Sequence, residues 1–263
     1  MKKPVLLILF ILYTAKLFAT GNDTDSLKQK ALIYTDHLDS LKQELELTTY
    51  DSLKAPIYTQ IALEYIKYDT VDNKKTRLAY QNLALTNTYS ALHLYSRYND
   101  TVGLRISFDN LASVYHAQHK YSQAKWFILQ SNTLSRYKND NPNIITSLLK
   151  LASIKADIKD YSLAMRDLNE ALTISSANHY PERESEVQLN YALLYSKMKN
   201  YDKSAIALKR HKAIDDSIRK AEESKLMAKL AARDSSLQAK KKFYTLSNKK
   251  SSKNNSSKRI ALL

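Results

Sequence analysis

Two histidines, His116 and His119, carry the side chains best suited to hold a metal ion in this sequence. Their spacing would place both imidazoles on one face of a helix, but a zinc site needs further histidine, carboxylate or cysteine ligands. No such ligands are patterned nearby, and the chain contains no cysteine. We therefore predict no metal site and no cofactor, with His116 on a binding face and His119 in a loop.

Patterns typical of catalysis are also missing. The chain has 2 glycines, too few for a loop that cradles phosphate with its backbone amides. It shows neither an HExxH pattern nor a recognisable Ser/His/Asp arrangement, and without cysteine it offers no thiol nucleophile. The sequence predicts a protein that is not an enzyme.

A tripeptide of aspartate, serine or threonine, and an aliphatic residue recurs along the chain. We expect most copies to cap helices, because Asp and Ser oxygens accept hydrogen bonds from free backbone amides at helix starts. The alternative is O-glycosylation, since the tripeptides resemble the acceptor of some bacterial periplasmic glycosylation systems. The copies lie at 25–27, 39–41, 51–53, 69–71, 100–102 and 216–218.

Composition limits the elements that could position these side chains. With 2 Gly and 4 Pro, a large β-protein is disfavoured, because tight turns between strands rely on both residues. Hydrophobic residues make up 44% of the chain, enough to bury a core, and the 19 tyrosines suit half-buried helix faces. The sequence predicts an all-α fold.

Three segments align without gaps at a spacing of 40 residues. Each is interpreted as two helices, with apolar residues at helical spacing on both sides of a polar break. The breaks fall at 119–120, 159–160 and 199–200, where Asp and Asn tolerate the turn conformation. Small residues recur where the paired helices should cross. The aligned positions are Leu111, Ala112, Tyr115, Tyr121 and Ala124; Leu151, Ala152, Tyr161 and Ala164; and Ala192, Tyr195 and Tyr201.

These positions resemble the signature of the tetratricopeptide repeat (TPR), with a period longer than that repeat's usual 34 residues. Alanine stands where the consensus has glycine, and Lys155 replaces a consensus tyrosine. The resemblance implies an antiparallel helix-pair solenoid, wound as a right-handed superhelix. The expected parts are a capping helix at 22–50, a degenerate unit at 51–104, three repeats at 105–214, a charged helix at 215–246 and a basic disordered tail at 247–263.

In TPR proteins the first helix of each repeat lines a concave groove that binds peptides or a partner's helix. The resemblance therefore implies a protein or peptide partner, whose backbone or carboxylates Asn and Lys side chains could bind. The alternative is a solvated inner face without a partner. The groove residues implied are Asn110, Ser113 and His116; Lys150, Ser153 and Asp157; and Asn190 and Lys197.

The N-terminus has the pattern of a secretory signal peptide. Lys2 and Lys3 precede an apolar run at 4–12, and small residues follow at Ala19 and Gly21. The run is short for a membrane span, so we expect a cleaved signal at 1–21. This predicts an exported, periplasmic protein. The alternative is an uncleaved anchor in the inner membrane.

Charge is concentrated at the C-terminal end. The net charge is +15, and residues 225–263 carry 11 basic residues against 1 acidic residue. The body of the chain, 22–224, has 27 basic and 25 acidic residues, which argues against a nucleic-acid surface. The basic arm could instead contact anionic lipid headgroups.

A second resemblance covers most of the chain. A signal peptide, long-period repeats and a charged helix after Ile218 together resemble the periplasmic half of repeat-containing bacterial two-component sensors. This resemblance implies a non-enzymatic scaffold that serves as the sensing part of a signalling system. The alternative is an envelope structural protein that docks to anionic membrane through its basic arm.

Overall fold

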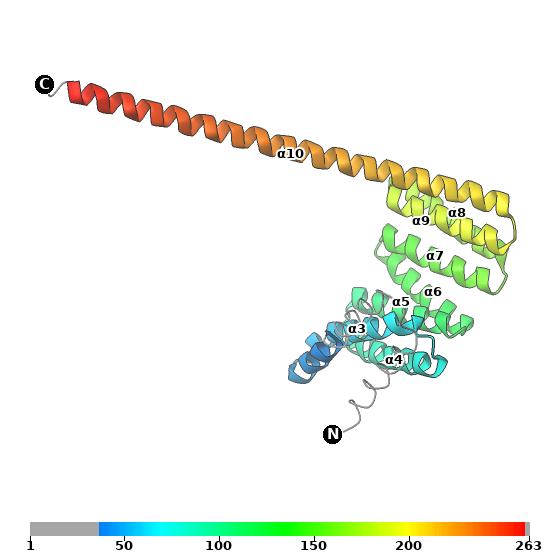
Figure 1. The fold of residues 1–263 in the computed structure, drawn as a ribbon. Coiled ribbons are helices and arrows are strands. Elements are labelled where there is room, and N and C mark those ends of the chain that lie inside the picture. The colour runs from blue at the N-terminus through cyan, green and yellow to red at the C-terminus, as the bar shows by residue number, and fades with distance from the viewer. Residues whose placement is uncertain (1–36, 261–263) are drawn as a thin grey trace, which may run out of the picture. The chain divides into compact units, whose positions relative to one another are not determined.

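The computed structural model describes residues 37–260, with side chains as far as residue 241 except residue 239. The expected signal peptide and the first part of the capping segment lie outside this range. Within it, every element is a helix (Figure 1). After a helix at 37–47, the elements are α3 (Asp51–Lys67), η1 (Tyr68–Thr70), α4 (Lys74–Arg97), α5 (Thr101–Ala117), α6 (Tyr121–Tyr137), α7 (Asn141–Asp157), α8 (Tyr161–Ala177), α9 (Pro181–Lys197) and α10 (Tyr201–Ile260).

The chain forms two compact units, Met1–Asp167 and Leu168–Leu263. In the first, α4 packs against α3 and α5, and α6 packs against α5 and α7. In the second, α9 packs against α10. The predicted all-α fold of antiparallel helix pairs is confirmed.

The repeat has a finer step than the predicted period. Helices α5 to α9 each contain 17 residues, and each begins 20 residues after the one before. A residue in the left-handed conformation ends each helix from α4 to α9, with φ between 53° and 65°. These residues are Asn99, His119, Asn139, Lys159, His179 and Lys199. The period of 40 is therefore two equal steps of 20, and His119 lies in a loop as predicted.

The turn residue differs from the predicted one. Lys159 and Lys199 take the left-handed conformation, whereas Asp160 and Asn200 cap the following helix. The Asp160 carboxylate accepts a hydrogen bond from the Leu163 amide at 3.3 Å. The two positions have different requirements. The residue at 159 or 199 must adopt positive φ, and the residue at 160 or 200 must supply a side-chain acceptor for free amides.

Helix capping by the recurring tripeptides is confirmed at one copy. The Asp100 carboxylate accepts hydrogen bonds from Val102 and Gly103, each at 3.0 Å. Asp39 and Asp216 instead lie inside helices, and Asp69 lies in η1, where it accepts a hydrogen bond from Gln81. Capping is wrong for these three, because their flanking residues continue the helix.

Replacing Lys159 by glycine is expected to stabilise the protein by about 1 kcal/mol, because glycine adopts positive φ without the Cβ clash. The same change at Lys125, an exposed position inside α6, should destabilise by about 1 kcal/mol. Urea unfolding of both variants measures the two signs. A loss of stability at both positions would show that the left-handed turn is unstrained.

The described part of the segment predicted to be a capping helix packs against α3. Leu38 and Leu41 share a core cluster with Ile57, Ile61 and Tyr65 of α3. Within the segment 51–104, α3 and α4 pack together, with η1 between them in the sequence. Ala84 and Ala91 of α4 are fully buried, so small residues mark the helix crossing here as well.

The repeat-defining side chains are mostly buried. Leu111, Leu151 and the small residues Ala112, Ala124, Ala152, Ala164 and Ala192 are all at most 5% exposed. Tyr115, Tyr121, Tyr161 and Tyr195 are half-buried. Tyr201 differs, with 68% of its surface exposed. It begins α10, the last of the described helices.

Two positions twelve residues apart join the helices of the first two repeats by different chemistry. Tyr115 of α5 stacks on Phe127 of α6, with ring centroids 5.5 Å apart and ring planes 2° apart. At the equivalent positions of α7 and α8, Lys155 and Asp167 form an ion pair. Their side chains are only 10% and 5% exposed, so this pair is a core contact.

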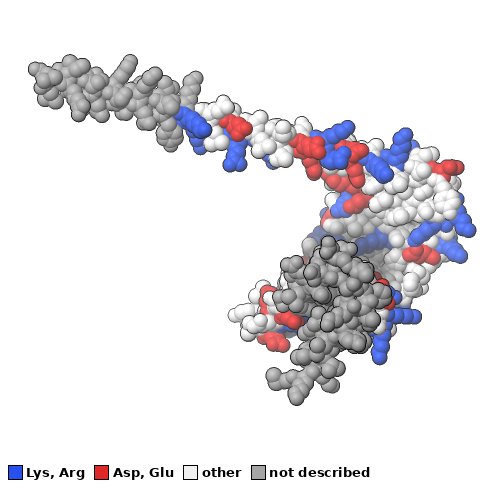
Figure 2. Space-filling model, viewed as in Figure 1, with Lys and Arg blue, Asp and Glu red and all other residues white. Residues whose placement is uncertain are grey.

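Helix α10 runs without interruption from Tyr201 to Ile260 and continues well past the end of α9 (Figure 1). The predicted boundary between the third repeat and the charged helix, at 214–215, lies inside this helix, and the segment predicted to be disordered from 247 is helical through Ile260. Runs of Ala, Lys and Leu before Phe243 favour helix, and the same helix continues into 247–259, which contains neither Ala nor Leu. Basic and acidic side chains both line its described surface (Figure 2). None of the described helices is long and apolar enough to cross a membrane.

Tyr191 of α9 donates a hydrogen bond to Asn169 Oδ1 of α8 at 2.5 Å. Burial raises the pKa of its phenol from 10.0 to about 12, and the nearby Tyr195 phenol adds to the shift. The unfolded chain therefore loses this proton first, so stability present below pH 10 should be lost as the pH rises from 10 through 12. Tyr191→Phe should flatten this loss in urea titrations across that range; an unchanged slope would contradict the assignment.

Candidate partner-binding face

The first helices of two neighbouring repeats, α5 and α7, meet through charged side chains. Asp109 of α5 accepts a hydrogen bond from Arg105 at 2.9 Å and lies 3.7 Å from Lys150 Nζ of α7. Near the other end, His116 Nε2 lies 2.5 Å from Asp157 Oδ2. Two contacts, seven residues apart on each helix, thus join α5 to α7.

Asn110 stands out on this face. It is 8% exposed, and its side-chain Nδ2 has no hydrogen-bond partner. A buried donor without a partner costs about 1–3 kcal/mol, so buried amides are normally satisfied. Asp109 Oδ1 is likewise buried without a hydrogen bond. Two consecutive residues of α5 thus each have a buried side-chain atom without a hydrogen bond, and Asp109 Oδ1 lies 3.7 Å from the half-buried Lys150.

Six of the eight predicted groove residues lie on α5 and α7, and contacts join members of both helices. Ser113 is half-buried and donates to the Asp109 carbonyl at 2.8 Å, and Ser153 is half-buried. The other two lie on α9 in the second unit. There the Asn190 amide donates to the Glu186 carbonyl at 2.9 Å, and Lys197 is exposed.

Arg105 and Asp109 were missed by the sequence analysis. Their side chains are only 16% and 13% exposed and form an ion pair four residues apart on one helix. That spacing is a recognisable signal for a pair on a helix surface, and it could have added both residues to the predicted face.

The two histidines considered as metal ligands contact different residues. His116 pairs with Asp157, whereas His119 Nδ1 lies 2.9 Å from the Tyr121 hydroxyl. Among the described residues, no group of three or more potential ligands gathers in one place. His116 therefore belongs to the contact between α5 and α7.

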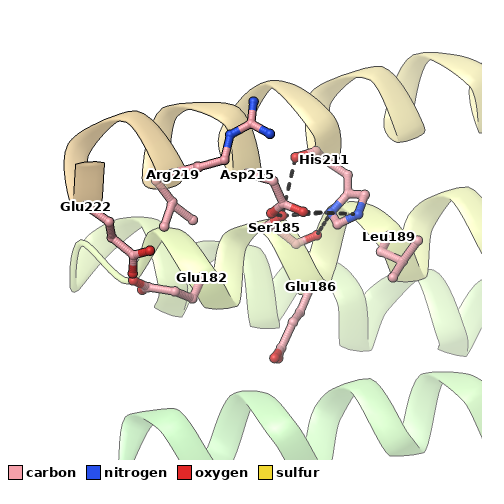
Figure 3. Close-up of a pocket in the computed structure, with 9 residues that line it drawn as sticks. Glu182, Ser185, Glu186, Leu189, His211, Asp215, Arg219 and Glu222 are labelled. Carbon is pink, nitrogen blue, oxygen red and sulfur yellow. Dashed lines mark hydrogen bonds and ion pairs between the residues drawn. The ribbon is translucent and has the colours of Figure 1, made fainter. Parts of the chain in front are cut away.

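A Ser/His/Asp cluster that the sequence analysis did not foresee lies between α9 and α10. Figure 3 shows the Ser185 hydroxyl between the side chains of His211 and Asp215. Ser185 Oγ lies 2.7 Å from His211 Nδ1 and donates a hydrogen bond to the Asp215 carboxylate. His211 Nε2 lies 3.5 Å from that carboxylate.

The order of contacts in this cluster differs from that of a catalytic triad. In a triad the histidine takes the serine proton and the carboxylate orients the histidine. Here the serine hydroxyl donates directly to the carboxylate, and Ser185 is only 3% exposed. The cluster borders an open cavity of about 410 Å³ that also contains Glu182, Glu222 and Arg219. Its contacts join α9 to α10.

The fold defines a TPR-like helix-pair solenoid. No protein-family model and no curated protein matches the chain. Among solved structures, it resembles BtubC (BKLC) from P. vanneervenii, with a TM-score of 0.59 at 16% identity, over 74% of this chain and 78% of that one. A putative kinesin light chain from Podosopora anserina with nearly identical TPR-like repeats gives a TM-score of 0.56 at 13% identity, over 72% and 90%.

The apo form of RapI also resembles the chain, with a TM-score of 0.56 at 17% identity. The match covers 70% of this chain and 63% of RapI, so the chain spans less than two thirds of that structure. At these identities the likeness concerns the fold alone.

Proposed function

We propose that the protein is a non-enzymatic scaffold that binds a peptide or protein partner on the face formed by α5 and α7. The observation that carries the proposal is the buried, unpartnered amide of Asn110, which follows Asp109, whose carboxylate lies 3.7 Å from Lys150 Nζ. Peptide carbonyls accept hydrogen bonds, so a partner whose binding opened this position would satisfy the amide. The TPR-like fold supports the proposal, since such arrays present first-helix side chains along one surface.

The charges on this face favour an acidic or carbonyl-rich ligand. Asp109 lies closer to Arg105, at 2.9 Å, than to Lys150, at 3.7 Å. Lys150 is also the more exposed of the two basic side chains, at 36% against 16%. Its ammonium is therefore the group best placed to meet a partner's carboxylate in a charge-assisted hydrogen bond.

We further propose that the protein is exported and serves as the sensing part of a signalling system. Support comes from the pattern of residues 1–21, which has a basic start, an apolar run and small residues at the expected cleavage site. The long α10 supports a signalling role, because a continuous helix can transmit movement from the last repeat.

Affinity capture from the periplasm with the mature protein tests the binding proposal. Asn110→Leu should weaken capture of the partner while raising the protein's own thermal midpoint, because it removes an unsatisfied buried donor. Lys150→Glu should also weaken capture, whereas Lys125→Glu on the exposed surface of α6 should not. If every partner is retained by both face variants, this face is not the binding site.

A second candidate function rests on the excess of basic residues at the C-terminal end. With 11 basic residues and 1 acidic residue in 225–263, this arm could hold the protein at anionic membrane as an envelope structural factor. Cosedimentation with vesicles containing anionic lipid measures this directly. Binding that survives deletion of 225–263, or that is insensitive to salt, would argue against it.

A further inference from the structure

The third repeat differs from the first two at the two positions, twelve residues apart, whose side chains join the helices in those repeats. The first repeat has the ring pair Tyr115 and Phe127, and the second has the ion pair Lys155 and Asp167. In the third repeat, the equivalent residues are Tyr195 of α9 and Ala207 of α10. An alanine is too small to reach the tyrosine ring as phenylalanine does, so this repeat lacks the connecting side chain.

An open cavity of about 320 Å³ lies where that side chain is missing. Ala207 lines it from α10 together with Lys203 and Arg210, and Tyr191 and Tyr195 line it from α9. The two tyrosine rings are stacked, with centroids 6.2 Å apart. Residues from three helices of the second unit, α8, α9 and α10, thus line the cavity, and the two tyrosine rings form one side of it.

The first repeat shows what such a space accommodates. There Phe127 contacts four aromatic rings, with centroid distances of 4.8–6.3 Å to Tyr89, Phe108, Tyr115 and Trp126. Eighty residues later, three of these neighbours are replaced by Asn169, Gln188 and Ile206, all of which line the cavity. The helix register and one aromatic neighbour, Tyr195, are retained, but the phenyl ring itself is absent.

The rim of the cavity is basic. Lys203 lies with its Nζ 5.8 Å from the Tyr195 ring centroid, and Arg210 is exposed beside it. Within the described part of the chain, neither cation has an ion-pair partner. At the equivalent positions the first repeat has Gln123 and Gln130, so the positive charge is particular to the repeat with the cavity.

We propose that this cavity binds the aromatic side chain of an acidic peptide segment supplied by a partner protein. The ring would occupy the place that Phe127 fills in the first repeat, stacked on Tyr195, where aromatic pairs gain energy beyond area burial. Carboxylates next to that ring in the peptide would meet Lys203 and Arg210.

This site is separate from the groove proposed above. On α9, successive residues are rotated by about 100°. Asn190 and Lys197 therefore share one side of the helix, while Tyr191 and Tyr195 project from a side more than 90° away. A partner could thus occupy the cavity without touching the predicted groove residues of the same helix.

Binding of a labelled synthetic peptide, Gly-Ser-Glu-Phe-Glu-Ser-Gly, tests the proposal by fluorescence anisotropy with the full chain. The wild-type protein should bind it, and should bind the version with alanine in place of phenylalanine at least about tenfold more weakly. Ala207→Phe should abolish binding, because its own ring fills the cavity as Phe127 does. Ala205→Phe adds the same ring to an exposed position of α10 and should leave binding unchanged.

Charge reversal supplies a second test that does not depend on how the core tolerates a new ring. Lys203→Glu and Arg210→Glu alter exposed side chains, and together they should weaken binding about tenfold and remove its salt dependence. Absence of wild-type binding, or equal binding by Ala207→Phe, would overturn the proposal. A change of oligomeric state in Ala207→Phe without peptide would also overturn it, because the natural occupant would then be a second copy of the chain.

Discussion

Asp167→Ala is expected to destabilise the protein by about 3–5 kcal/mol, the usual loss when one partner of a buried ion pair is removed. The Lys155 ammonium would be left in a site where its side chain is 10% exposed. Arg166, whose Nη2 lies 3.9 Å from Asp167, is 70% exposed and would be solvated without its partner. The loss therefore comes from Lys155, and urea unfolding followed by circular dichroism measures it.

The first repeat supplies a control for this prediction. The double variant Lys155→Tyr with Asp167→Phe installs the side chains that join α5 and α6, and apolar replacement of a buried pair is often neutral or stabilising. We expect its stability to lie within about 1 kcal/mol of the wild type or above it. If the double variant loses as much as the sum of the single changes, the two positions are not coupled and the prediction is wrong.

Gly103→Ala is expected to destabilise the protein by about 2 kcal/mol, although alanine favours helix over glycine. A Cβ at Gly103 would lie 2.2 Å from Tyr95 Cδ1 and 2.4 Å from its Cγ. The Tyr95 ring has little freedom to move, because it is 9% exposed and its hydroxyl lies 3.2 Å from Thr59 Oγ1. Overpacking should therefore outweigh the gain in helix propensity.

A double-mutant cycle with Tyr95→Leu isolates this clash. Removing the ring in the wild-type background should destabilise the protein, since a buried aromatic side chain is lost. With alanine at Gly103, the same change should cost less, because the space is partly refilled. A coupling energy near zero would show that the helices separate without strain, and the close approach of α4 and α5 would need another explanation.

The sequence was sufficient to predict the helix pairs and their period. Alanines recur at helix crossings because larger side chains would separate the backbones, and Ala112, Ala124, Ala152 and Ala164 are all buried as expected. The step of 20 residues was missed, since first and second helices bury different side chains and do not align with each other. Lys159 and Lys199 were missed as turn residues because lysine has no preference for positive φ.

The predicted face was only partly recoverable from the sequence. Positions on first helices follow from the repeat register, and the structure joins His116 to Asp157 and Asp109 to Lys150. The burial of Asn110 depends on neighbouring helices, so no local pattern reveals it. The cavity at Ala207 could have been found by comparing the residues at 115 and 127, 155 and 167, and 195 and 207 across the three repeats. The first pair is two aromatic residues, the second is two opposite charges, and the third is a tyrosine with an alanine.

The different chemistry of these pairs has a consequence for how the chain finds its correct arrangement. Helices α5 to α9 have one length and one type of turn, so backbone geometry alone would let a helix pair with the wrong neighbour. If α5 took the place of α7 as the repeat partner of α8, Tyr115 would face Asp167. If α7 took the place of α5 as the repeat partner of α6, Lys155 would face Phe127. Each mismatch buries a charge without its counter-charge. The different residue pairs therefore disfavour misassembly and exchange of helices between copies.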